Sequence, residues 1–85
     1  MSKYKTKCWG ETYIIKADFD RPESQIQILG DDGDWQGTAY QVAAYSTPAE
    51  AMRAVLIDSL EASGGDWEDS ESDIERAAAS VQAIE

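Results

Sequence analysis

The apolar residues of this 85-residue chain change their spacing once, close to residue 46, and that change limits the folds open to it. Before it, lysines and less polar residues alternate over residues 3–8, the two-residue period of a half-buried strand. After it, Met52, Val55 and Leu56 follow one another at spacings of three and one, as along one face of an amphipathic helix. The chain is therefore expected to begin as a sheet and to end as helices, which is an α+β arrangement.

Four alternating runs precede the change. They cover residues 3–9, 12–19, 24–30 and 35–45, and short turn-forming stretches rich in Gly, Pro and Asp separate them. We expect these runs to pair as two hairpins in one antiparallel four-stranded sheet. In the last run, Thr38, Tyr40, Val42 and Ala44 are expected to face the core.

Two helices are expected after the sheet. Thr47 suits an N-cap, Pro48 the first helical position and Glu50 the third, which together make a capping box, and Gly64 with Gly65 should end this helix. Residues 72–75 repeat the capping pattern, so a second helix should carry the apolar stripe Ile74, Ala77, Ala78, Val81 and Ile84. The predicted order is ββββαα, with both helices on one face of the sheet. It forms a single domain over residues 1–85, divided into a sheet portion, 1–45, and a helical acidic portion, 46–85.

The core of such a domain should be small. Leu, Ile, Val and Phe make up 14 of the 85 residues, and the net charge is -10, a composition that leans towards disorder. Three Trp and four Tyr, together with the periodicity, favour a folded domain with a weak core.

The residue types exclude most catalytic chemistry. The chain has no His and one Cys, so Ser-His and Cys-His pairs are impossible, and it has no glycine-rich phosphate loop. We therefore predict no enzyme activity and no cofactor. The acidic groups at residues 18–23 and 31–34 lack the spacing of a calcium loop and are interpreted as turns, so no metal is expected either.

Cys8 and the N-terminal residues bear on where the chain works. A lone cysteine forms no internal disulfide, and Cys8 is interpreted as a small buried hydrophobe on a strand. No apolar segment follows the basic N-terminal residues and none approaches membrane-spanning length. The expectation is a cytoplasmic protein.

Charge is the most informative feature for function. Residues 1–16 carry four Lys and one Glu, a net +3, whereas residues 17–85 carry sixteen acids and three Arg, a net -13. The lysines are interpreted as protection of an outer strand against strand addition. An acidic body attracts basic proteins and repels nucleic acid and membranes, so the expected partner is a basic nucleic-acid-binding protein or complex.

The acids concentrate in residues 58–75, which hold eight of them. If this segment were largely helical, at about 1.5 Å per residue, it would present one carboxylate per ~3.4 Å, although Gly64 and Gly65 interrupt the helix. That spacing matches the phosphates along one strand of duplex DNA, also ~3.4 Å apart. Trp67 is interpreted either as an anchor for a partner or as a hydrophobic staple on the following helix. The candidate partner-binding residues are Asp58, Glu61, Asp66, Trp67, Glu68, Asp69, Glu71, Asp73 and Glu75, with a secondary acidic turn of Asp31, Asp32 and Asp34.

Two families share features with this chain. Residues 72–76, SDIER, with Ser80 and Val81 resemble the helical tail of a phage-encoded anti-CRISPR protein. That resemblance implies a DNA mimic that blocks a type I, Cascade-like surveillance complex, with Asp66, Glu68, Asp69, Glu71, Asp73 and Glu75 replacing phosphates. The lysines of residues 3–7 depart from a uniformly acidic mimic.

The second resemblance covers residues 31–65. Its acidic turn, strand and helix start, with Glu50 and Ala51 in the helix, are similar in layout to HicB-type antitoxins, although the Gly-Cys element of that family is missing. This resemblance implies an acidic antitoxin that masks a small basic toxin. A third alternative is an acidic phage or plasmid interaction domain whose charge only maintains solubility.

Overall fold

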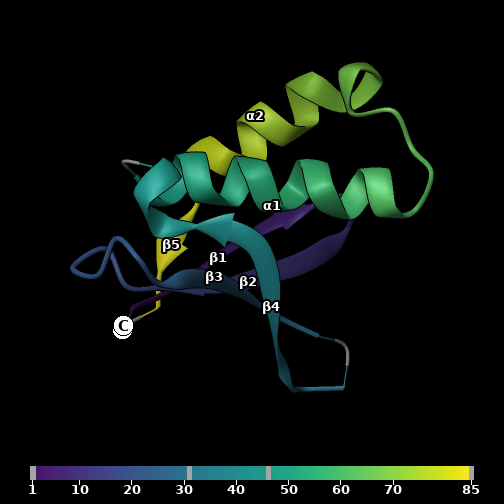
Figure 1. Ribbon diagram of the computed structural model, residues 1–85. Helices are drawn as coiled ribbons and strands as arrows, with labels where there is room; N and C mark the ends of the chain where they lie inside the picture. The colour runs from purple at the N-terminus through teal and green to yellow at the C-terminus, as the bar shows by residue number, and fades with distance from the viewer. Residues whose placement is uncertain (1, 31, 46, 85) are drawn as a thin grey trace.

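The computed structural model describes residues 2–30, 32–45 and 47–84. Within them the chain forms strands β1 (Ser2–Cys8), β2 (Glu11–Ala17), β3 (Gln25–Leu29) and β4 (Trp35–Gln41), followed by the short 3-10 helix η1 (Val42–Ala44) and helix α1 (Pro48–Ala62). The 3-10 helix η2 (Trp67–Ser70), helix α2 (Glu71–Ala79) and strand β5 (Gln82–Ala83) complete it. The described strands, labelled in Figure 1, make one antiparallel sheet in the order β4-β3-β2-β1-β5.

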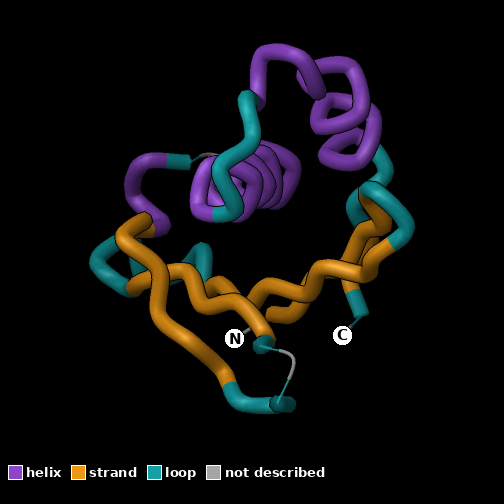
Figure 2. Tube along the Cα trace, turned by 90° about the vertical axis from the view of Figure 1, so that its right-hand side faces the viewer, coloured by secondary structure: helices purple, strands orange, loops and turns teal. Residues whose placement is uncertain are grey.

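The molecule has two layers. Helices α1 and α2 lie side by side over one face of the sheet, and the other face is left open (Figure 2). The largest fully buried side chains come from both layers: Ile15 and Ile26 from the sheet, and Met52, Leu56 and Ile74 from the helices. The predicted α+β class, with helices on one face, is confirmed.

The strand count was wrong, because the described sheet has five strands instead of four. Helix α2 ends at Ala79, and Val81 and Ile84 lie beyond it. The segment after α2 pairs with β1 through Tyr4 and Lys5, and the Ile84 N–H donates to the Lys3 carbonyl at 2.9 Å. Val81 and Ile84 keep the apolar spacing of a helix, so the helix was predicted to continue through them. In the structure, the residues after Ala79 instead form hydrogen bonds with the open edge of β1. The element order is therefore ββββααβ.

The fourth strand is shorter than predicted. It ends at Gln41, and the chain turns into η1, where the Val42 N–H donates to the Ser24 carbonyl at 2.9 Å. Val42 is buried, as expected, but Ala44 is exposed. The alternation failed at Ala44 because the 3-10 turn replaces the period of a strand.

The ends of α1 follow the prediction. The Thr47 hydroxyl accepts a hydrogen bond from the Glu50 N–H at 3.2 Å, and Pro48 occupies the first turn. At the other end Gly64 has φ +85°, a left-handed conformation that glycine adopts readily. The Gly64 N–H donates to Glu61 and the Gly65 N–H to Leu60, both at 3.0 Å, which is a Schellman motif.

The second capping box was wrong. Ser72 lies inside α2, and the chain begins to coil earlier, at Asp66. The Asp66 carboxylate accepts a hydrogen bond from the Glu68 N–H at 3.0 Å and so starts η2, which leads directly into α2. Asp is as good an N-cap as Ser, so the acidic cluster itself contained the start signal.

Candidate functional site

The eight acids of residues 58–75 all have exposed side chains on the helical side of the molecule. We call this set the acidic layer: Asp58 and Glu61 of α1, Asp66 of the connecting loop, Glu68 and Asp69 of η2, and Glu71, Asp73 and Glu75 of α2. The structure thus brings the predicted acids of residues 58–75 onto the two-helix layer.

The acidic layer is not a single row. The chain reverses direction between α1 and α2, which run antiparallel (Figure 1). The single helical line considered for residues 58–75 does not form, because the Schellman motif at Gly64 and Gly65, where the end of the helix was predicted, divides the segment. The carboxylates spread over two helices instead.

The two flanks of the acidic layer reach the two edges of the sheet. On one flank Asp58 lies near Tyr40 of β4, and the pKa of the Tyr40 phenol is raised chiefly by burial and then by the charge of Asp58. On the other flank Asp73 lies over the edge of β1 beside Cys8. The pKa of the Cys8 thiol is raised first by burial and then by the Asp73 charge. The layer thus extends across the whole width of the fold.

One member of the acidic layer is neutralised within the described residues. Glu75 Oε1 lies 3.0 Å from Arg53 Nε, an ion pair that joins α2 to α1. The other seven acids make no ion pair with any residue in 2–30, 32–45 or 47–84. Their charge is available to a partner.

Trp67 is held by α1. Its ring lies 5.6 Å from the Arg53 guanidinium, is half-buried and packs against the core. This placement agrees with the packing interpretation of Trp67, although its contacts are with α1 and not only with the helix that follows. Because the Arg53 guanidinium lies over the Trp67 ring, the ring packs beneath the acidic layer and connects η2 to α1.

The lysines lie on the opposite face of the sheet. Lys3, Lys5 and Lys7 alternate with the core-facing residues of β1, and the β1–β2 register places Lys16 opposite Lys3. Lys16 Nζ lies 4.6 Å from the ring centroid of Trp35. The interpretation of β1 as an outer strand holds only in part, because the two-residue strand β5 pairs with it at Tyr4 and Lys5 and leaves its edge without a described strand from Thr6 to Cys8. The sheet therefore separates Lys3 and Lys16 from the acidic layer, whereas Lys5 and Lys7, at the open edge of β1, line a pocket together with Asp73.

The secondary acidic turn lies elsewhere. Asp31 is outside the described residues. The Asp32 carboxylate accepts a hydrogen bond from the Asp34 N–H at 3.1 Å, and the Gly30 N–H donates to the Asp34 carbonyl at 2.8 Å. This hairpin turn projects away from the helices (Figure 1, lower right), so the structure does not join it to the acidic layer.

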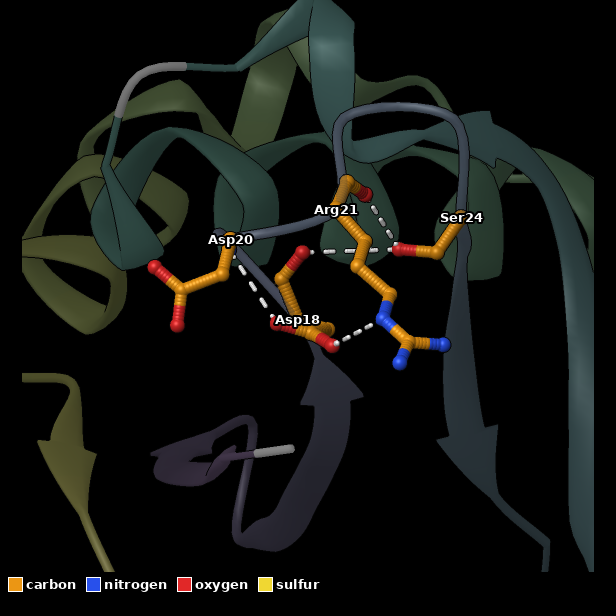
Figure 3. Close-up of polar contacts among 4 residues, drawn as sticks. All are labelled: Asp18, Asp20, Arg21 and Ser24. Carbon is orange, nitrogen blue, oxygen red and sulfur yellow. Dashed lines mark hydrogen bonds and ion pairs between the residues drawn. The ribbon is translucent and has the colours of Figure 1, made fainter.

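The acids near residue 20 also form a turn (Figure 3). Asp18 accepts from the Asp20 N–H at 3.1 Å and pairs with Arg21 Nε at 3.6 Å, while the Ser24 hydroxyl donates to the Arg21 carbonyl at 2.7 Å. The carboxylate of Asp20 points away from this network (Figure 3). In the part of the chain that the structure describes, no three acidic, Cys or His side chains are grouped to hold a metal ion.

Sequence reasoning missed Trp9. Its φ of +54° and that of Gly10, +77°, give the two-residue turn between β1 and β2 left-handed geometry at both positions. Such a turn prefers Asn, Asp or Gly at its first position, and a left-handed residue with a Cβ costs about 1–2 kcal/mol. The indole is 38% exposed and meets Tyr13 edge-on at 6.2 Å. The run predicted over residues 3–9 placed Trp9 at the end of a strand, whereas the structure ends β1 at Cys8 and puts Trp9 in the turn.

Comparison of the chain with protein-family models, with curated proteins and with solved structures found no match. None of the helices in the described segments combines the length and the apolar character that a membrane crossing requires. Function has to be inferred from the residues themselves.

Proposed function

We propose that this chain is a non-enzymatic binding protein whose acidic layer occupies a basic, nucleic-acid-binding surface of another protein. One observation carries the proposal: eight exposed carboxylates lie on the helical layer, seven of them without an ion pair to a described residue, while the lysines lie on the other face. A large excess of one sign of charge on one face is suited to meeting the opposite sign on a partner.

The physical advantage of this arrangement is in association and selectivity. Clustered carboxylates steer a basic partner towards the correct face and raise the association rate at low salt. The same charges repel nucleic acid and lipid headgroups from that face. Ordinary turns would not require so many acids, because Asp66 alone provides the cap that starts η2.

The arrangement of the helices also supports the proposal. The Arg53–Glu75 pair and the Trp67 ring tie η2 and α2 to α1, so the carboxylates are presented on a packed surface. Less ordering entropy is then lost when a partner binds. Within this class, the resemblance to anti-CRISPR proteins favours a DNA-mimicking role against a Cascade-like complex, with the phosphate path met by two helices and not by one row.

A charge-reversal experiment tests the proposal. The variant Glu68→Lys, Asp69→Lys and Glu71→Lys changes the net charge from -10 to -4, since each reversal adds two charges. The matched control Glu11→Lys, Asp20→Lys and Glu23→Lys changes the net charge equally at exposed residues outside the acidic layer and the secondary acidic turn. Each tagged protein is used to capture partners from bacterial lysates, including strains with type I CRISPR systems, with and without duplex DNA.

The proposal expects capture of a DNA-binding protein that is displaced by duplex DNA and weakened by added salt. The acidic-layer variant should lose about tenfold or more of this binding, and the control should keep most of it. Capture of one small toxin-like partner, indifferent to DNA and to salt, would favour the antitoxin-type alternative. Equal losses in both variants would refute the specific role of the acidic layer.

A further inference from the structure

The edge of β1 beside α2 is incompletely covered. Strand β5 is two residues long and pairs only with Tyr4 and Lys5, so within the described chain the rest of β1, towards Cys8, has no strand on that side. Helix α2 closes over part of this edge, where the Thr6 hydroxyl donates to the Ala77 carbonyl at 2.6 Å. A groove remains between the strand edge and the helix.

This groove has the size of a ligand site. Its volume is about 650 Å³, and ligand pockets span roughly 300–1,000 Å³. Residues of β1, of the β1–β2 turn, of the start of β2 and of α2 line it, together with Ser80 and with Gln82 of β5. We call it the β1–α2 groove.

The charge of the β1–α2 groove is opposite to that of the whole molecule. Lys5, Lys7 and Arg76 line it, and Asp73 is its one acidic lining residue among those described. None of the three cations makes an ion pair with a residue in 2–30, 32–45 or 47–84. A local charge of +2 therefore occurs in a chain with a net charge of -10.

The acidic layer is close to the groove on one side. Asp73 belongs to both surfaces, and helix α2, which forms one wall of the groove, also carries Glu71 and Glu75. At about 0.15 M salt the Debye length is ~8 Å, so an anion in direct contact with the three cations is attracted more strongly than it is repelled by acids beyond that distance.

Trp9 adds an aromatic surface to the groove. Its indole is one of two exposed large apolar side chains among the described residues, and its backbone is held in a left-handed conformation that bulky residues avoid. Strain of this kind is often retained where a side chain is needed for function. Trp9 lines the same groove as the unpaired cations.

We propose that the β1–α2 groove binds a nucleotide phosphate, free or within a single strand of nucleic acid. The phosphate meets Lys5, Lys7 and Arg76, and the base stacks on Trp9. Cations that follow a phosphate backbone, together with an aromatic ring that stacks a base, are the usual elements of single-strand recognition. This activity departs from the expectation of no direct contact with nucleic acid, and it does not depend on the proposed function of the acidic layer.

The test uses the ¹⁵N-labelled full chain in about 0.15 M salt, titrated separately with ATP, short oligothymidylate, inorganic phosphate and a polyglutamate peptide. The amides of β1, the Trp9 indole and the α2 end should shift with ATP or oligothymidylate. Saturation by ATP would identify a mononucleotide site, and saturation by the oligonucleotide alone would identify a strand site. Both results support the proposal.

Variants assign the binding to the groove. Trp9→Asn removes the ring and also suits the left-handed turn, so the fold should be kept while affinity falls about 5- to 100-fold. Lys5→Gln with Lys7→Gln should weaken binding about tenfold or more. The control Lys16→Gln with Arg21→Gln makes the same charge change outside the groove and should have little effect.

Three results would overturn the proposal. The first is the absence of shifts in the groove with either nucleotide probe. The second is equal binding of inorganic phosphate or polyglutamate, because then the base contributes nothing. The third is an equal loss of affinity in the control variant, because then only the overall charge matters.

Discussion

Ile74→Ala should release α2 and the carboxylates it presents. The helix has nine residues, too few to be stable alone in water, and its buried residues are Ile74, Ala77 and Ala78. Ile74 is 1% exposed and is the one large side chain of these three. The attachment of α2 to the core therefore depends mainly on this residue.

The expected loss is large for a domain of this size. Truncation of a buried Ile to Ala costs about 2–5 kcal/mol, of which part is the cavity left behind. At about 0.05–0.15 kcal/mol per residue, an 85-residue domain has roughly 4–13 kcal/mol of stability. The variant should thus lose a substantial fraction of it, with Tm falling by about 4–8 °C per kcal/mol.

Urea unfolding followed by tryptophan fluorescence and far-ultraviolet circular dichroism measures this loss. Ile74→Val should cost about 0.5–1.5 kcal/mol. Ser72→Ala, at an exposed position on the same helix, should change stability by no more than about 0.5 kcal/mol. A loss below about 1 kcal/mol for Ile74→Ala would show that α2 is not anchored by this side chain.

Two further predictions concern β1. Thr6→Val should lower the free energy of unfolding by about 0.5–1.5 kcal/mol in the same urea assay, because it removes the hydroxyl that donates to Ala77 O, while that carbonyl still accepts from the Ser80 N–H at 3.1 Å. Thr6→Ser keeps the hydroxyl and should retain most of the stability. An unchanged free energy of unfolding in Thr6→Val would contradict the role given to this hydrogen bond. The pKa of the Cys8 thiol is raised above its ordinary value of 9.0, first by burial and then by the charge of Asp73. The Cys8 thiol therefore contributes its full stabilisation below about pH 9 and loses it as the pH rises through the pKa of the folded state. Unfolding midpoints measured from neutral to alkaline pH should therefore fall less steeply in Cys8→Ala than in the parent chain just above about pH 9, and identical slopes would refute the contribution of Cys8.

Local patterns predicted much of the fold. The alternation in β1 and β2, the cap at Thr47 and the stop at Gly64 each depend on neighbours a few residues away, so they could be read along the chain. The start of η2 was missed although its signal is local, because Ser72 was chosen over Asp66 as the cap.

The candidate site was predictable as a set of residues and not as a surface. The carboxylates of residues 58–75 are exposed, as a run of charge predicts. The break at Gly64 and Gly65 was predicted, but the reversal that makes the two helices antiparallel and the contact of Trp67 with Arg53 were not. Neither of these has a periodic signature in the sequence.

The sequence by itself determined the change from strands to helices, the limits of α1 and the concentration of acidic residues in the second half of the chain. The tertiary structure decided that β5 pairs with β1, that the lysines and the acidic layer lie on opposite faces, and that a groove opens between β1 and α2. The reason is distance along the chain. The Thr6–Ala77 bond joins residues 71 positions apart, and such contacts follow from packing of the whole chain, which local periodicity does not encode.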